Sequence, residues 1–177
     1  PDAAEACAET NAPTTSTTLM IALGDALAVA LLESKGFKAD HFKVFHPGGK
    51  LGAMLRTAAD VMHSSGLPLA DAGAPFIEAV KAMSGKGFGV LGVVAKDGKL
   101  AGIVTDGDLR RHLTSGKSVS IIDDVMTKSP LTATPDSLAA DVLRTMNERK
   151  ITQIFVLSGG KPVGLIHMHD LLKSGLA

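Results

Sequence analysis

The strongest constraint on the fold of this chain is an internal repeat. The segment GIVTDGDL at residues 102–109 recurs as GLIHMHDL at residues 164–171. Two further pairs keep a similar spacing: DVM at 60–62 with DVM at 124–126, and AVKAM at 79–83 with VLRTM at 142–146. Self-similarity at a nearly fixed period indicates two copies of one structural unit. We therefore predict homologous units over residues 57–116 and 119–177.

Both units contain the same order of hydrophobic patterns. Apolar residues recur at helical spacing over 75–86 and 136–150, and β-rich runs follow over 89–105 and 151–167. Each run is interrupted by a compact turn, KDGK or SGGK, which favours a hairpin. A short helical pattern then closes each unit, so we predict helix, two strands and helix. So few strands cannot cover both faces of a sheet, and we expect the two copies to bury their strands against each other with the helices outward.

Composition excludes several classes of protein. The 177 residues are 45% hydrophobic and 20% charged, which is typical of a globular chain. Eighteen basic residues balance eighteen acidic ones and aromatic residues make up only 3%, so neither nucleic acid nor an anionic membrane is an expected partner. The single cysteine, Cys7, cannot form an internal disulfide, and no signal-peptide pattern is present. We expect a cytoplasmic location.

The first 56 residues differ in character from the repeats. Their longest apolar stretch, Leu19–Ser34, carries Asp25 and is shorter than a bilayer span, so we predict a buried helix of a soluble protein. Gly36 is well placed to end this helix, and FHPGGKLG at 45–52 predicts a tight glycine-rich loop. We expect residues 1–56 to belong to another domain, and the whole chain to be a piece cut from a longer protein, because it lacks an initiating Met and begins without periodicity.

The repeated motif resembles that of CBS domains. Its pattern is Gly102, two aliphatic residues, Thr105 and then Asp108. The resemblance covers about 120 residues and implies an α/β fold, a tandem pair of β-α-β-β-α modules related by a pseudo-twofold axis, with nucleotides bound in the clefts between them. It implies that Thr105 and Asp108 hold a ribose or phosphate, because a carboxylate accepts two ribose hydroxyls and a helix start attracts phosphate. Arg110 and Arg111 are candidate phosphate ligands or, alternatively, solvated surface cations. Asp108 has its own alternative role, which is to complement the helix dipole.

The second copy departs from this motif. His167 stands where the first copy has Thr105, and Asp170 corresponds to Asp108. An imidazole can still donate to an anion, but its bulk and partial charge change what fits, so we predict a second site that is empty or holds another part of the ligand. His167 and His169 have metal-chelating spacing, yet no cysteine or clustered carboxylate joins them, and we predict no metal.

The first 56 residues are similar to the last part of the sugar isomerase (SIS) domain in the arabinose 5-phosphate isomerase family (KpsF/GutQ type). The residues that carry the resemblance are APTTSTTLMIALGDALAVALLESKGF and FHPGGKLG. In that family an SIS domain precedes a CBS pair, and the enzymes interconvert ribulose 5-phosphate and arabinose 5-phosphate for Kdo and lipopolysaccharide biosynthesis. This reaction shifts a proton between C1 and C2 and requires no metal or other cofactor.

The same resemblance implies roles for individual residues. It places the catalytic histidine at His46, whose alternative role is to order the loop. The residues Thr14, Thr15, Ser16 and Thr17 match the family's hydroxyl loop near the sugar phosphate, although one of them could instead cap the following helix.

Three hypotheses for the function follow. In the first, the chain is the regulatory CBS pair of an arabinose 5-phosphate isomerase and binds CMP-Kdo or AMP, ADP or ATP. The catalytic core of that enzyme would lie outside this sequence, so this piece alone should be inactive. In the second, the CBS pair binds no ligand and only holds subunits together. The third, a CBS pair of a transporter or another enzyme, leaves FHPGGKLG unexplained. We expect a homo-oligomer, a dimer of CBS pairs within a tetramer of the complete enzyme.

Overall fold

The computed structural model describes residues 3–7, 9–10, 12–38, 41–42, 45, 50–116 and 118–176. The chain divides into two compact units, Pro1–Pro47 and Gly48–Ala177, and each is described by itself. The first unit contains the helix α1 (Thr15–Ser34). Gly36 follows with a φ of 61°, which only glycine adopts readily, and the helix ends there as the sequence indicates.

Helix α1 corrects two expectations from the sequence. It begins at Thr15 and runs for 20 residues, so it is long and apolar enough to cross a membrane, by length and composition only. The predicted burial is also wrong for this chain, because no residue of α1 is buried and Ile21 and Leu27 are 67% and 58% exposed. The apolar stretch in the sequence begins only at Leu19. The hydroxyl residues before it lengthen the helix without adding apolar side chains, so the sequence pattern does not reveal the first turn.

The second unit contains two separate β-sheets. The first has the order β1 (Leu69–Asp71), β2 (Val90–Val94), β3 (Leu100–Thr105) and β4 (Thr127–Lys128). The second has the order β5 (Thr132–Ala133), β6 (Gln153–Ser158) and β7 (Lys161–His167). In each sheet a short strand pairs in parallel with the first strand of an antiparallel hairpin. Both predicted hairpins are therefore present.

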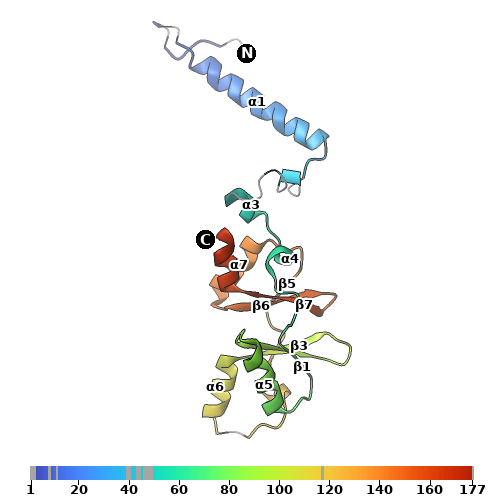
Figure 1. Ribbon diagram of the computed structural model, residues 1–177. Helices are drawn as coiled ribbons and strands as arrows, with labels where there is room; N and C mark the ends of the chain where they lie inside the picture. The colour runs from blue at the N-terminus through green and yellow to red at the C-terminus, as the bar shows by residue number, and fades with distance from the viewer. Residues whose placement is uncertain are drawn as a thin grey trace. The chain divides into compact units, whose positions relative to one another are not determined.

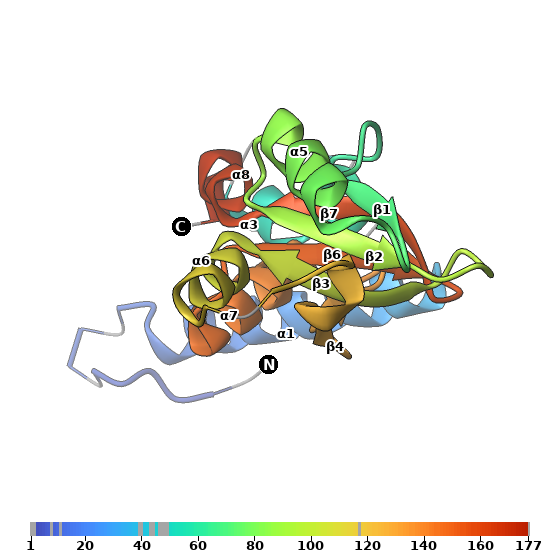
Figure 2. The same ribbon diagram turned by 90° about the horizontal axis from the view of Figure 1, so that it is seen from below.

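Helices cover the outer face of each sheet (Figure 1). The first sheet carries α5 (Phe76–Lys86) and α6 (Asp106–Thr114), which Figure 2 shows from their own side. The second carries α7 (Ala139–Arg149), the short helix α8 (Met168–Leu171) and a π-helical turn, η2 (Leu172–Leu176). Two further short helices, α3 (Lys50–Met54) and α4 (Ala58–Val61), precede the first sheet in sequence, and a 3₁₀ turn, η1 (Ile122–Asp124), precedes β4.

The inner faces of the two sheets pack against each other. The buried side chains of Val90, Phe155 and Leu165 form this central layer, and each sheet has its own apolar core on the helical side. The order of layers is helices, sheet, sheet, helices (Figure 1). The predicted mixed α/β pair with strands inward and helices outward is confirmed.

The two copies of DVM cross over in space. The residues around the first copy pack on the second sheet, where Ala58 is buried and the backbone N–H of His63 donates to the carbonyl of Leu165 at 2.8 Å. The segment before the second copy packs on the first sheet, where Ile122 is buried and its N–H donates to the carbonyl of Ala74 at 3.0 Å. Each half is therefore completed by the residues around the DVM segment of the other repeat. We call these residues its lead-in segment.

Candidate functional site

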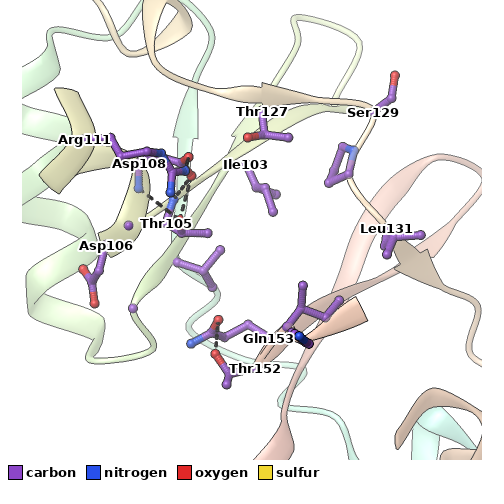
Figure 3. Close-up of a pocket in the computed structure, with 16 residues that line it drawn as sticks. Ile103, Thr105, Asp106, Asp108, Arg111, Thr127, Ser129, Leu131, Thr152 and Gln153 are labelled. Carbon is purple, nitrogen blue, oxygen red and sulfur yellow. Dashed lines mark hydrogen bonds and ion pairs between the residues drawn. The ribbon is translucent and has the colours of Figure 1, made fainter. Parts of the chain in front are cut away.

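The two halves of the second unit enclose a cleft of about 640 Å³ (Figure 3). One wall is built from the end of β3, the start of α6 and the segment around β4. The other comes from the residues between α7 and β6. The lining residues are Gly89, Val90, Ile103, Thr105, Asp106, Gly107, Asp108, Arg111, Thr127, Ser129, Pro130, Leu131, Lys150, Ile151, Thr152 and Gln153. We call this the first cleft.

A capping box organises the first wall. The backbone N–H and the hydroxyl of Thr105 both donate to Oδ2 of Asp108, at 2.8 and 2.7 Å, and the N–H of Asp108 donates to the Thr105 hydroxyl oxygen at 3.3 Å. Thr105 is the last residue of β3 and has extended backbone angles, which suit the N-cap of α6. The guanidinium of Arg111, one turn further on, pairs with the other carboxylate oxygen of Asp108.

These contacts fix the Asp108 carboxylate before any ligand arrives. Its side chain is only 11% exposed, and each of its oxygens already has a partner within the chain. Asp108 therefore has a structural role as the third residue of α6, where it completes the capping box with Thr105. Because a carboxylate oxygen has more than one lone pair, the same group can still accept a further hydrogen bond from a ligand.

The opposite wall contains a polar pair that the sequence analysis did not single out. The side-chain amide of Gln153 donates to the carbonyl oxygen of Phe88 at 2.8 Å, and the Thr152 hydroxyl donates to Gln153 Oε1 at 2.8 Å. The first of these bonds joins the two halves across the cleft. Aligning the repeats through their strands pairs Thr152 with Gly89 and Gln153 with Val90, and this contrast is the sequence signal that would have found them.

Gly89 allows the two walls to approach each other. A Cβ atom at this position would lie 2.9 Å from a carboxylate oxygen of Asp106 and 3.4 Å from Gln153 Nε2, and the backbone has a φ of +68°. A larger residue would therefore be strained and would displace groups that line the first cleft.

The predicted residues of the first copy separate into two groups. Thr105, Asp108 and Arg111 lie together in the first cleft (Figure 3). Arg110 is exposed and does not line it, and instead borders a hollow of about 400 Å³ on α6 together with Gly107, Arg111 and Thr114. Of the two arginines, Arg111 is the one placed to reach a ligand in the first cleft.

The corresponding residues of the second copy make different contacts. His63 Nε2 and Asp170 Oδ2 lie 2.9 Å apart, and the His63 ring meets the ring of Phe88 edge-on at 5.1 Å. His63 corresponds to Thr127, because each follows a DVM segment. His167 is the N-cap of α8, and its Nδ1 accepts a hydrogen bond from the N–H of His169 at 3.2 Å. In the second copy, the imidazole of His63 therefore bonds the carboxylate of Asp170.

The pKa of His167 is lowered from its usual value of 6.5. Burial is the main cause, and electrostatic interactions with His169, His63 and Lys173 lower the pKa further, while Asp170 raises it. The imidazole is therefore held preferentially in its neutral form. Its ring lies 4.9 Å from that of His169, but no set of three or more potential metal ligands gathers among the residues that the structure describes.

The hydroxyl loop at the start of α1 is organised by Glu5. Its Oε2 accepts hydrogen bonds from the N–H and hydroxyl of Thr14, at 2.7 and 3.1 Å, and from the N–H of Ser16 at 3.4 Å. The pKa of Glu5 is lowered to about 2. The largest cause is a hydrogen bond from the Ser16 side chain, and the bonds from Thr14 and from the Ser16 N–H add to it. Thr14 is the N-cap of α1 but contributes no side-chain cap, and the Thr17 hydroxyl donates back to its carbonyl at 2.8 Å. Thr15 is the first helical residue, and His46 lies outside the described residues.

Comparison with known proteins identifies the class to which this architecture belongs. Residues 53–115 and 122–176 match the sequence profile of the CBS domain. Among solved structures, an uncharacterized conserved protein from Pyrococcus horikoshii superposes with a TM-score of 0.62 at 29% identity, covering 70% of this chain and 55% of that one. CBSX2 in complex with AMP superposes with a TM-score of 0.61 at 24% identity, covering 68% and 96%. The chain belongs to the CBS domain family, and the predicted CBS pair is confirmed.

More similar relatives carry one name. The chain is 47% identical over 97% of its length to arabinose 5-phosphate isomerase KdsD of Pseudomonas aeruginosa, and 40% identical over 98% to the protein of the same name from Escherichia coli (strain K12). The resemblance predicted from the sequence is confirmed. The chain spans about half the length of the curated relatives it matches, 54% in both cases.

Proposed function

We propose that this chain is the regulatory, nucleotide-binding part of an arabinose 5-phosphate isomerase. The observation that carries the proposal is the first cleft with its preorganised Thr105–Asp108 pair. Its volume of about 640 Å³ lies within the range of small-molecule sites. The Asp108 carboxylate would accept ribose hydroxyls, and the guanidinium of Arg111, which lines the cleft from the last turn of α6, would bind phosphate. The apolar side chains of Ile103, Leu131 and Ile151 would contact the base.

Nucleotides bound by the same fold support this assignment. CBSX2 has been seen with AMP, and the CBS pair of MJ0100 with 5′-methylthioadenosine and S-adenosyl-L-methionine. Both are only 24% identical to this chain, so the likeness is one of fold and the residues of the first cleft carry the argument. CMP-Kdo, as a nucleotide-linked product of the pathway, and AMP, ADP or ATP are the candidate ligands.

A thermal-shift screen against ATP, ADP, AMP, CMP and CMP-Kdo tests the proposal. A ligand at a hundredfold excess over its Kd stabilises the folded state by about 2.7 kcal/mol, which shifts the Tm measurably. If none of the five ligands shifts the Tm, the second candidate function gains support. In that function the CBS pair binds nothing and serves only to join subunits.

For the longer enzyme we propose that residues 1–56 end the SIS domain, followed by CBS units at 57–116 and 119–177. In this arrangement His46 is catalytic, and the loop of Thr14, Thr15, Ser16 and Thr17 lies near the sugar phosphate. Replacing His46 by alanine in the full-length protein should lower turnover at least about a hundredfold, as expected for a lost general acid or base. Nucleotide binding should stay unchanged in that variant. Turnover at the wild-type level would leave His46 a loop-ordering residue.

We further propose that the protein is cytoplasmic and that the rest of the SIS domain covers α1. Asp25 lies in the middle of this helix, where a charge is costly within a bilayer. The full-length protein should therefore remain in the supernatant after ultracentrifugation without detergent. Recovery only with the membrane fraction would instead favour a membrane-spanning helix.

The outer helices support a homo-oligomer. Ile77 on α5 is 61% exposed and Leu113 on α6 is 72% exposed, and a C2 partner is the commonest way to bury such residues. We propose a dimer of CBS pairs, within a tetramer of the full-length enzyme. Light scattering of residues 57–177 at micromolar concentration measures the mass, and a strictly monomeric value with and without nucleotide would contradict the dimer.

A further inference from the structure

The polar pair on the second wall of the first cleft has a fixed direction of hydrogen bonding. A backbone carbonyl can only accept, so the contact between Phe88 O and the Gln153 side chain requires the amide nitrogen of Gln153 to face it. This fixes the orientation of the whole amide group. Gln153 Oε1 must then be the atom that faces the Thr152 hydroxyl, at 2.8 Å.

The fixed amide determines what Thr152 can offer a ligand. An amide oxygen cannot donate, so the single hydroxyl proton of Thr152 goes to Gln153 Oε1. The Thr152 oxygen retains only lone pairs. Towards the first cleft it therefore acts as an acceptor, although a free threonine hydroxyl can act as donor or acceptor.

The position of this acceptor suits the base of a nucleotide. Thr152 and Gln153 lie across the cleft from Thr105 and Asp108, where the ribose and phosphate groups would bind (Figure 3). Ile151 and Leu131 line the same side of the cleft and supply apolar contacts for a planar ring. An acceptor beside them would meet the exocyclic group on the edge of the base.

We infer that Thr152, oriented by Gln153, selects a base with an exocyclic amino group, such as adenine or cytosine, over one with a keto group at that position. An amino group donates to the Thr152 oxygen, whereas a keto oxygen would face its lone pairs without a hydrogen bond. This inference rests on the proposed function, in which the first cleft binds a nucleotide. Thr152 is then the specificity-determining residue and Gln153 a positioning residue.

Matched nucleotide pairs test this inference directly. AMP and IMP differ at C6, with an amino group in AMP and a keto group in IMP, and at the adjacent N1, which is bare in AMP and carries a hydrogen in IMP; CMP and UMP differ in the same way at C4 and N3. Isothermal titration of the whole chain should give AMP about five- to tenfold tighter binding than IMP, and CMP the same advantage over UMP. The expected ratio is modest because Thr152 is exposed to water.

Two variants assign the selectivity to this pair of residues. Thr152→Val keeps the shape but removes the acceptor, so the AMP-to-IMP ratio of affinities should fall to about one. Gln153→Met releases the Thr152 hydroxyl to rotate and donate, so the ratio should fall mainly because IMP binds better. The control is Thr145→Val on the exposed side of α7, where the hydroxyl donates to the carbonyl of Asp141 at 2.9 Å, and the ratio should not change.

The outcomes separate this inference from the proposed function. Equal binding of AMP and IMP by the wild-type chain would overturn the role of Thr152 while leaving nucleotide binding intact. A preference for AMP that survives in Thr152→Val would place the selectivity in other residues. Failure of all four nucleotides to bind, together with no Tm shift from ATP, ADP or CMP-Kdo, would overturn the proposed function, and the inference with it. Circular dichroism of each variant shows whether it is folded.

Discussion

The two copies of the CBS motif share a scaffold but bind their central carboxylate differently. In the first cleft, Asp108 is held by Thr105 and Arg111 at the edge of an open volume of about 640 Å³. In the second copy, Asp170 is bonded at 2.9 Å by His63, and the imidazole rests edge-on against Phe88. Duplication of a fold therefore does not duplicate the contacts of its central carboxylate. In the second copy that carboxylate bonds His63, at the position where the first copy has Thr127.

The sharpest test of this difference is to remove each carboxylate in turn. Asp108→Ala should weaken AMP binding by about ten- to a hundredfold, because it removes charge-assisted hydrogen bonds to the ligand. Asp170→Ala should change it less than about threefold, because Asp170 is not among the residues that line the first cleft. Titration calorimetry measures both affinities. Equal losses in the two variants would mean that the two copies bind alike.

A second test converts one copy towards the other. Replacing His63 and His167 by threonine reproduces the residues Thr127 and Thr105 of the first copy. Asp170 would then be free to accept ribose hydroxyls, and the number of AMP molecules bound per chain should rise from one to about two, with the added site weaker by up to about tenfold. A stoichiometry that stays at one would show that other differences, such as Phe88, close the second copy.

Gly89 offers a test of how closely the walls of the first cleft must approach. In Gly89→Ala, the added Cβ would collide with the Asp106 carboxylate at a backbone φ of +68°, and we expect a loss of about 1–3 kcal/mol in the free energy of unfolding. The control is Gly85→Ala inside α5, where nothing lies within 4 Å, and it should stabilise the chain by about 0.5–1 kcal/mol. Urea denaturation compares them. Similar changes in both variants would contradict the close approach.

The smallest expected effect is a dependence of stability on pH in the second copy. The pKa of His167 is lower in the folded chain than its usual 6.5, so the unfolded chain binds the proton more strongly. This contribution to stability is fully present above pH 6.5 and decreases as the pH falls below it. Between pH 7.5 and 5 the wild-type chain should lose about 1–3 °C more in Tm than His167→Asn. Parallel profiles for the two proteins would show that His167 does not contribute.

Local features of the fold and the site were predictable from the sequence, and distant ones were not. The capping box of Thr105 and Asp108 joins residues three apart, so its pattern is visible in one short segment. The hairpins around KDGK and SGGK are local in the same sense. The bond between His63 and Asp170 joins residues 107 positions apart, and no periodicity in the sequence indicates such a contact.

Short elements and indirect roles also escaped the sequence analysis. The strands β1 and β5 have only three and two residues, which is too short for an alternating pattern. The CBS resemblance implied a strand at each place, but the residues alone did not. Thr152 and Gln153 were missed for another reason: the repeats differ at these positions, but the sequence does not show that Gln153 bonds the backbone carbonyl of Phe88.

The crossed lead-in segments determine how this chain can be divided. A cut between the two repeats would leave Ala58 on one piece and its buried neighbours Val142 and Met146 on the other, and would likewise part Ile122 from Phe76. Neither piece alone has a complete core, so the two fragments should remain associated after cleavage and should complement each other when expressed separately. We therefore expect the pair to fold as a single cooperative unit, because the contacts that complete either half form between residues far apart in the sequence.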